Sequence, residues 1–225
     1  MKSHNFKLAL RNLLKHKSFT LINLFGLATS LAACIIILTY YAYEISFDKH
    51  IPDSERTYRI ITRLGEGKFW SQTFACYGDA LTDRPEVEKF TSFISTKQSI
   101  INAGETDFTI SESVIADTAF IDFFDIEFVS GRKEDLGQPN NVFITQEMAK
   151  ILYPGENPLG REIFLRQFEG NTADSIGHYS IAGIVKPLPD NTHFGFKLIF
   201  SQQGHLSGLM SRLKEGKLFG SNVYV

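Results

Sequence analysis

The chain has 225 residues, 43% of them hydrophobic, and its 23 Lys and Arg residues nearly balance its 25 Asp and Glu residues. As an average, this composition is typical of one ordinary globular domain or two small ones. The charges are uneven, however. Residues 1–47 hold five basic residues and one acidic residue, which leaves 18 basic and 24 acidic residues, a net charge of −6, in residues 48–225. This acidic remainder argues against a nucleic-acid partner, which would need a basic surface.

Residues 18–43 contain no Asp, Glu, Lys or Arg. At about 1.5 Å per residue, the inner twenty of them already cover the roughly 30 Å hydrocarbon core of a membrane. Aromatic residues lie near both ends of this run, as in the belts of membrane helices. We therefore predict a transmembrane helix at residues 18–45. Because all five early basic residues precede it, the positive-inside rule places residues 1–17 in the cytoplasm and residues 46–225 in the periplasm.

The segment before this helix is basic and has an apolar stripe of Phe6, Leu10, Leu13 and Leu14. This pattern indicates an amphipathic helix in the headgroup region, although a plain positive flank of a membrane helix explains the charges equally well. Within the helix, residues 26, 30 and 34 are small and form a weak candidate face for a partner helix.

Two kinds of processing are less consistent with this segment. The apolar run is too long for a cleavable signal peptide, whose core has about 7–15 residues. Residues 31–34, Leu-Ala-Ala-Cys, have the form of a bacterial lipobox, but Cys34 is followed by the apolar residues 35–38 instead of a polar tether. We therefore favour an uncleaved helix. With Cys76 as the second cysteine, the chain cannot build a disulfide framework.

Residues 48–225 alternate short apolar runs with turn residues, which predicts a sheet-rich α+β domain with helices packed on the sheet. A hairpin turn is expected at Gly65 and Gly67, a polar loop at residues 132–141, and helix N-caps at Asp117 and Thr145. Helices are expected at residues 71–81, 118–124, 146–152 and 206–213. Strands are expected at residues 57–62, 88–95, 98–101, 107–110, 113–116, 141–145, 160–165, 179–185 and 197–200.

Enzyme signatures are absent from the sequence: it has no G-x-S-x-G, G-x-x-x-x-G-K-[ST], H-E-x-x-H or C-x-x-C motif. Asp122 and Asp125 could pair for acid–base chemistry, but the polar face of a short helix explains them better. The histidines at 178, 193 and 205 lack metal-ligand spacing, and residues 48–50 are interpreted as a solvated exit from the membrane helix. We predict no catalytic, cofactor-binding or metal-binding residues, and no cofactor. The 20 Phe residues suit either a core or an apolar groove.

Several segments, taken in order, resemble the MacB/FtsX-type ABC transporter permeases, and the Bacteroidetes-type branch in particular. The resemblance covers nearly the whole chain, and no single motif carries it. The matching segments are residues 8–17 and 19–28 around the start of the first membrane helix, 46–52 at its exit, and then 56–59, 120–125, 130–132, 144–149, 153–160 and 184–186.

This resemblance implies a permease subunit of the mechanotransmission type, in the inner membrane, that works with a separate ABC ATPase subunit. It also implies a second permease copy or homologue, a periplasmic adaptor or lipoprotein, and membrane lipid as partners. Residues 1–17 would be a cytoplasmic amphipathic segment, 18–45 the membrane helix and 46–225 the MacB-like periplasmic core domain. The substrate would be exported or released from the periplasmic side, unless the protein is a division-type member that activates cell-wall hydrolases.

Members of this family continue into further membrane helices, so we expect the chain, which ends at Val225, to be an N-terminal part of a longer permease or a truncated product. The alternative is a single-helix, membrane-anchored periplasmic module for binding or signalling. An anchored envelope enzyme is a third hypothesis, disfavoured because no catalytic group of residues is visible.

Overall fold

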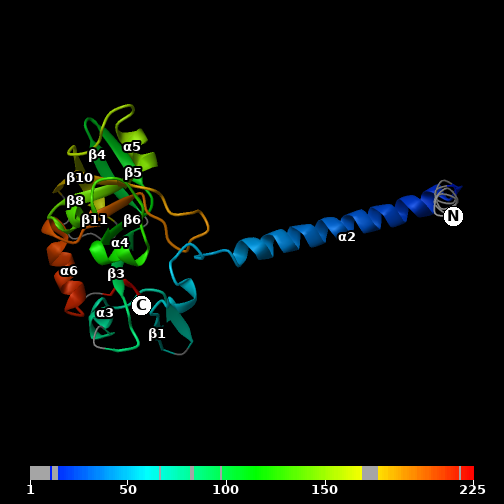
Figure 1. The fold of residues 1–225 in the computed structure, drawn as a ribbon, viewed down its shortest axis with the longest axis horizontal. Coiled ribbons are helices and arrows are strands. Elements are labelled where there is room, and N and C mark those ends of the chain that lie inside the picture. Colours follow the sequence, from blue (N-terminus) through cyan, green and yellow to red (C-terminus); the bar gives the residue numbers. More distant parts are fainter. Residues whose placement is uncertain are drawn as a thin grey trace. The chain divides into compact units, whose positions relative to one another are not determined.

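The computed structural model describes residues 11, 15–65, 67–81, 84–96, 98–168, 177–217 and 219–225. The chain divides into two compact units, Met1–Phe47 and Asp48–Val225 (Figure 1). The amphipathic segment expected within residues 1–17 lies almost entirely outside the described residues.

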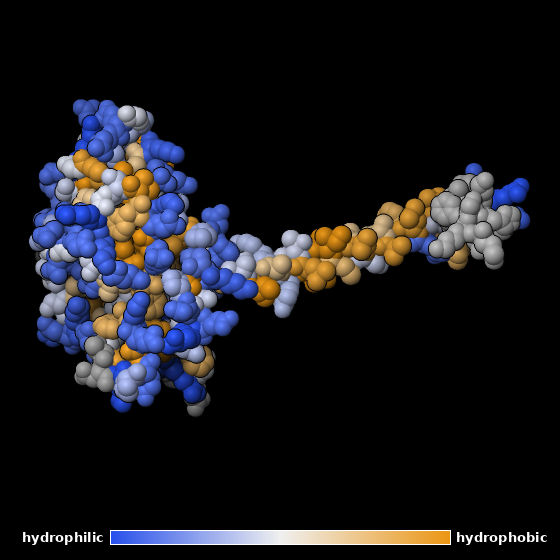
Figure 2. Space-filling view, viewed as in Figure 1, coloured by the Kyte–Doolittle hydropathy of each residue, from blue (hydrophilic) through white to orange (hydrophobic). Residues whose placement is uncertain are grey.

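The first unit contains one long helix, α2 (Lys17–Glu44), which is apolar along its length (Figure 2). It is long and apolar enough to cross a membrane, and none of its residues is buried in protein. The hydroxyls of Thr29, Ser30 and Thr39 each donate a hydrogen bond of 2.6–2.8 Å to the carbonyl oxygen four residues earlier. Polar groups within hydrocarbon need such internal partners, so the helix suits a lipid environment.

The second unit combines a mixed β-sheet with short helices, as the predicted α+β class requires. Its helices are α3 (Cys76–Leu81), α4 (Thr118–Phe123), α5 (Gln146–Leu152) and α6 (Ser207–Lys214), with 3₁₀ helices η1 (Ser54–Arg56), η2 (Lys133–Gly137) and η4 (Gly204–Leu206). Its strands are β1 (Thr62–Leu64), β2 (Lys68–Trp70), β3 (Thr91–Thr96), β4 (Ser99–Ala103), β5 (Thr106–Ile110), β6 (Ser113–Ala116), β7 (Phe128–Ser130), β8 (Asn141–Thr145), β9 (Glu162–Phe168), β10 (Gly177–Val185), β11 (Leu198–Ser201) and β12 (Asn222–Tyr224).

Ten of these strands form the main sheet, in the order β12-β3-β6-β11-β8-β10-β9-β4-β5, with β7 paired to the end of β10. The pairs β11–β6 and β10–β8 are parallel and the other pairs in this sheet are antiparallel. Strands β1 and β2 form a separate antiparallel hairpin.

The central strands are buried on both faces, which explains their continuous apolar runs. In β8, Val142 and Ile144 enter one apolar cluster, whereas Phe143 between them enters the cluster on the opposite face. Helices α5 and α6 contribute to the first cluster, and α4 and η2 contribute to the second. The sheet is therefore covered by helices on both sides.

The second cluster is rich in aromatic residues. The ring of Phe93 lies 4.8–5.9 Å from those of Phe120, Phe124, Phe194 and Tyr224, which come from α4 and its C-cap, the loop before β11, and β12. Phe93 itself is 1% exposed. Many of the 20 Phe residues thus fill the core, and each fully buried one contributes about 1.5–3 kcal/mol of transfer free energy.

Two expected elements are wrong because distant residues pair with them. The strand expected at 57–62 begins only at Thr62, since the preceding residues pair with the C-terminal strand: the Tyr58 N–H donates to the Val225 carbonyl oxygen at 2.8 Å. The helix expected at 71–81 begins at Cys76, since Thr73 forms a β-bridge with Ser221.

The remaining expected elements lie within three residues of those observed. Asp117 and Thr145 cap α4 and α5 as predicted, and the turn between β1 and β2 lies at the expected glycines. Strands β7 and β12 and the 3₁₀ helix η2, which lies inside the expected polar loop, were not anticipated. Each has at most five residues, too few for a clear period in the sequence.

Candidate functional site

The two aspartates considered for acid–base chemistry have different surroundings. The carboxylate of Asp122 lies 2.7 Å from Nζ of Lys133, and Asp125 is exposed in a left-handed turn with φ 48°. Among the described residues, no group of three or more His, Cys, Asp or Glu side chains is placed to hold a metal ion.

The three histidines each have a different partner. Nδ1 of His178 lies 3.4 Å from the Glu162 carboxylate, and the backbone N–H of His205 donates to Asn140 Oδ1 at 2.8 Å. His193 contacts Asp48, the first residue of the second unit. Of these three contacts, the one between His193 and Asp48 reaches the residues just after helix α2. We call it the Asp48 junction.

In the Asp48 junction, one carboxylate accepts three hydrogen bonds. They come from Thr192 Oγ1 at 3.0 Å, from the backbone N–H of His193 at 3.0 Å, and from His193 Nδ1 at 2.6 Å. The backbone N–H of Asp48 donates in turn to the carbonyl oxygen of Asn191 at 3.0 Å. The Asp48 side chain is only 27% exposed, although it follows the apolar helix by four residues.

The same contacts determine the charge of Asp48. Partial burial alone would raise the pKa of this carboxyl group, but hydrogen bonds from the backbone and side chain of His193 and from Thr192 outweigh it. The net result is a pKa below the ordinary aspartate value. Asp48 is therefore an anion at neutral pH.

The chain between residues 48 and 53 is held at a second point. Ile51 is 4% exposed and belongs to the aromatic cluster around Phe93. Asp48 and Asp53 both have positive φ angles, 56° and 53°, so the backbone turns sharply on either side of Ile51. The residues that follow helix α2 are thus fixed to the domain by a polar contact and by a buried side chain.

The partner of Asp48 lies in residues 186–197, which connect β10 to β11. Both strands pair with β8 at the centre of the sheet. The junction therefore joins the segment after α2 to a loop whose two ends enter central strands. Our interpretation of residues 48–50 as a solvated exit is wrong for Asp48, because its partners lie more than 140 residues away and leave no local signal.

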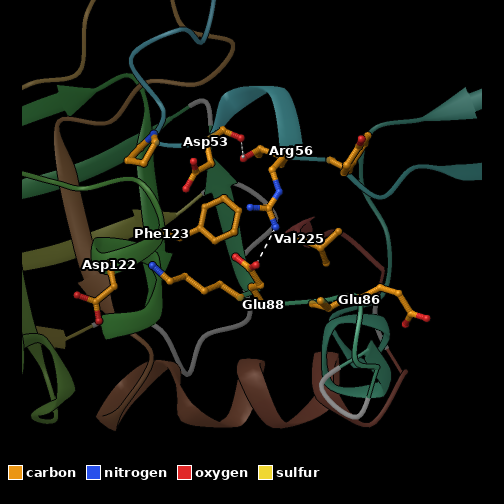
Figure 3. Close-up of a pocket in the computed structure, with 12 residues that line it drawn as sticks. Asp53, Arg56, Glu86, Glu88, Asp122, Phe123 and Val225 are labelled. Carbon is orange, nitrogen blue, oxygen red and sulfur yellow. Dashed lines mark hydrogen bonds and ion pairs between the residues drawn. The ribbon is translucent and has the colours of Figure 1, made fainter.

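A pocket of about 260 Å³ lies beside residues 52–58 (Figure 3). Across it, a nitrogen of the Arg56 guanidinium lies 2.7 Å from the Glu88 carboxylate, next to the ring of Phe123. The hydrogen bond from Arg56 holds the pKa of Glu88 below its ordinary value. Both side chains are about two-thirds exposed, so this is a surface ion pair.

Comparison with protein families gives one match that covers most of the chain. Residues 20–225 match the model of a family described as the MacB-like periplasmic core domain. A comparison with curated protein sequences found no significant match.

Solved structures with a similar fold come from bacterial membrane transport proteins. A domain of a protein from Porphyromonas gingivalis, provisionally named a permease, has a TM-score of 0.62 at 18% identity, over 80% of this chain and 76% of that one. The periplasmic region of MacB from Actinobacillus actinomycetemcomitans has a TM-score of 0.55 at 16% identity, over 80% and 78%. The extracellular domain of the noncanonic ABC-type transporter YknZ from Gram-positive bacteria has a TM-score of 0.48 at 16% identity, over 68% and 72%. At these identities, the likeness to the first two structures concerns the fold.

Proposed function

Since this chain belongs to the family of MacB-like periplasmic core domains, we propose that it is the permease part of an ABC transporter of the mechanotransmission type. The observation that carries this proposal is the family match over residues 20–225, which includes both the apolar helix and the domain. The partner that we propose for this role is a separate ABC ATPase that hydrolyses ATP in the cytoplasm.

The proposed topology follows from the charge distribution. Residues 1–17 lie in the cytoplasm, residues 18–45 cross the inner membrane and residues 46–225 lie in the periplasm. The five basic residues before the helix and the single acidic residue at its far end support this orientation. In this proposal helix α2 is part of a permease that works as a dimer with a second copy or a homologue, and an adaptor or lipoprotein can dock on the periplasmic side.

The Asp48 junction is suited to transmit movement in such a machine. A displacement at the end of the membrane helix reaches Asp48 through four residues of chain, and three hydrogen bonds then pass it to residues 191–193. That loop leads directly into β10 and β11, which are packed on both faces and move as one body with the sheet. A solvated, untethered linker would absorb the displacement instead.

Isolation of the full chain from membranes of its native host tests the proposal. We expect an ATPase with a phosphate-binding motif to co-purify at a fixed ratio to the chain, and its ATP hydrolysis to depend on the chain. The variant Asp48→Ala should bind this ATPase but weaken the dependence. The matched control Asp122→Ala, which also removes an ion-paired carboxylate, should leave it unchanged. A chain that purifies with no ATPase contradicts the proposal and favours an anchored binding or signalling module.

The orientation has its own test. In a chain whose own Cys34 and Cys76 are replaced by Ser, the variant Lys150→Cys puts a new thiol in place of an exposed side chain of helix α5. We expect a maleimide that cannot cross membranes to label it in spheroplasts without lysis, and a cysteine in place of Lys15 to react only after lysis. Labelling in the reverse order would show that residues 46–225 face the cytoplasm.

A further inference from the structure

Exposed apolar side chains in the second unit are concentrated in one short segment. Among the described residues after Asp48, seven large apolar or aromatic side chains are exposed, and five of them lie within residues 58–77. The other two, Val129 and Ile151, are isolated in the sequence. The five are Tyr58, Ile61, Phe69, Trp70 and Tyr77, with exposed fractions between 45% and 66%. Single exposed apolar residues are ordinary, but a group of this kind indicates a contact surface.

The centre of this group is the β1–β2 hairpin. All three residues of β2 are exposed, including Phe69 at 63% and Trp70 at 48%. Arg63 pairs with Phe69 across the hairpin, and its guanidinium lies 6.0 Å from the centre of the Phe69 ring. A separate hairpin with three residues in each strand gains little stability of its own in water. Its structure therefore depends on contacts with other parts of the molecule.

Ring contacts fix the hairpin to the domain. The ring of Trp70 lies 5.7 Å from that of Phe219, Phe219 lies 5.3 Å from Phe74, and Phe74 lies 5.8 Å from Tyr77. Nε of Arg59 also donates to the carbonyl oxygen of Ser71 at 3.1 Å, at the end of β2. These contacts fix the Trp70 face of the hairpin to the domain, while Phe69 and its cross-strand partner Arg63 lie on the opposite face.

Basic residues alternate with these rings. Arg63 and Lys68 are exposed on paired strands, and the sequence from 58 to 77 holds three basic residues and one acidic residue, Glu66, a net charge of +2. This local composition is the opposite of the domain as a whole, which has a net charge of −6. Aromatic rings beside Lys and Arg are typical of side chains at the membrane–water interface, where the rings enter the headgroup layer and the cations meet lipid phosphates.

We propose that this aromatic–basic surface, the β1–β2 hairpin with Arg63 and Phe69 on one face and Lys68 and Trp70 on the other, rests on the lipid headgroups of the membrane that α2 spans. The helix ends at Glu44, only 24 residues before Lys68, so the chain itself keeps the lipid surface at a high local concentration. The short tether favours lipid over a protein partner, which would have to be recruited from solution. The inference rests on the membrane helix of the proposed function and is independent of the ABC ATPase.

Trp70 is the only tryptophan in the chain, so its fluorescence reports this surface directly. The full chain is reconstituted in bilayers of phosphatidylcholine and phosphatidylglycerol that carry bromine atoms at defined depths on the acyl chains. We expect bromines near the headgroups to quench Trp70 more strongly than bromines at the chain ends, because the ring lies at the interface. Quenching should weaken in phosphatidylcholine alone, which has no net charge.

Two variants test the chemistry of the contact. Each positive charge removed, by Arg63→Gln or Lys68→Gln, should lower the ratio of lipid-bound to free hairpin by about fivefold in the anionic bilayer. Phe69→Ser should also reduce the quenching. Ile151→Ser, which removes a similarly exposed apolar side chain from helix α5, should not. Circular dichroism checks that each variant keeps its fold.

The other outcomes overturn the inference. If acrylamide quenches the fluorescence of Trp70 and brominated lipid does not, the surface faces water. Trp70 shielded from acrylamide only at high protein density would mean that a second copy of the chain covers it. Failure of the chain to enter bilayers at all would instead contradict the membrane helix of the proposed function, so the two failures are distinguishable.

Discussion

The carboxylate of Asp48 shows how one residue can join two distant parts of the chain. Its three hydrogen bonds connect the residues after α2 to the loop between β10 and β11. Each typical hydrogen bond contributes about 0.5–1.5 kcal/mol. Because His193 is 63% exposed, solvent weakens its share.

We expect Asp48→Ala to lower the free energy of unfolding by about 1–2 kcal/mol at neutral pH. The folded-state pKa of Asp48 lies below the ordinary value, so its charge stabilises the fold above the unfolded pKa, about 3.9. This contribution is lost as the pH falls through the folded-state pKa. Urea unfolding in detergent at pH 7 and pH 3 measures it: the difference between wild type and variant should shrink on acidification. An equal difference at both pH values would contradict the assignment.

Gly131 illustrates a backbone requirement at residue scale. It follows β7 with φ 90°, and an added Cβ would lie 2.5 Å from the carbonyl oxygen of Ala182. Gly155 has a comparable φ of 76°, but an added Cβ there would meet no atom within 4 Å. The two positions therefore separate the cost of the left-handed conformation from the cost of a clash.

We expect Gly131→Ala to destabilise the domain by about 3 kcal/mol and Gly155→Ala by only about 1 kcal/mol. The larger effect combines the left-handed strain with displacement of β10 from β7. Denaturant unfolding followed by circular dichroism gives both values. Equal effects in the two variants would show that β10 shifts to accommodate the new methyl group without lowering the free energy of unfolding further.

At the scale of elements, helix α2 and helix α5 contrast two meanings of an exposed apolar side chain. Leu31 in α2 and Ile151 in α5 are 58% and 54% exposed. Leu31 has only apolar and small neighbours along the helix, whereas Ile151 lies beside polar residues of a seven-residue helix. Lipid is the expected solvent of the first and water that of the second.

Arginine substitution distinguishes these environments. Near the centre of a membrane helix, arginine costs about 2.5–3.5 kcal/mol. We therefore expect Leu31→Arg to lower the ratio of inserted to non-inserted chain by about a hundredfold. Alkaline extraction of membranes measures this ratio, and Ile151→Arg is the matched control with no expected change. Insertion that is equal in both variants would contradict a lipid environment for Leu31.

The helices and strands that were predicted correctly from the sequence are those that neighbouring residues determine. Helix α2 follows from 26 consecutive residues without a charged side chain, and the start of α4 follows from the Asp117 carboxylate, which accepts from the Ala119 N–H at 3.0 Å. The errors at Thr73 and Tyr58 came from pairing with Ser221 and Val225. No window of neighbouring residues contains that information.

The candidate site was harder to predict than the fold for the same reason. The family resemblance located the exit of the membrane helix, but it assigned no role to Asp48. The charge at this position is visible in the sequence, whereas its partner His193 lies 145 residues further on. Only the topology that places the β10–β11 loop beside residue 48 brings them together. A polar residue directly after an apolar helix is normally solvated, so the sequence favoured the wrong interpretation.

At the scale of the whole second unit, the first and last parts of the domain fold against each other. Besides the Tyr58–Val225 contact, the N–H of Ile60 donates to the carbonyl oxygen of Val223 at 2.9 Å. Strand β12 also pairs with β3, and Tyr224 packs into the aromatic cluster around Phe93. These contacts join opposite ends of the domain. They can therefore form only when both its first and its last residues are present.

Removal of residues 221–225 tests how far the domain depends on these contacts. Val223 is fully buried and Tyr224 is 6% exposed, and burial of two such side chains contributes about 3–6 kcal/mol. That is a large fraction of the roughly 5–15 kcal/mol that holds a typical domain together. We expect the shortened chain to lose the cooperative unfolding transition and to be cleaved rapidly by protease. Val225→Ala is the matched control: it keeps the backbone pairing to Tyr58, so its protection should stay close to that of the wild type. A shortened chain that still unfolds cooperatively would mean that β3 can end the sheet and that the segment around Tyr58 is held well enough by its other contacts, among them Ile51 and the Arg56–Glu88 ion pair.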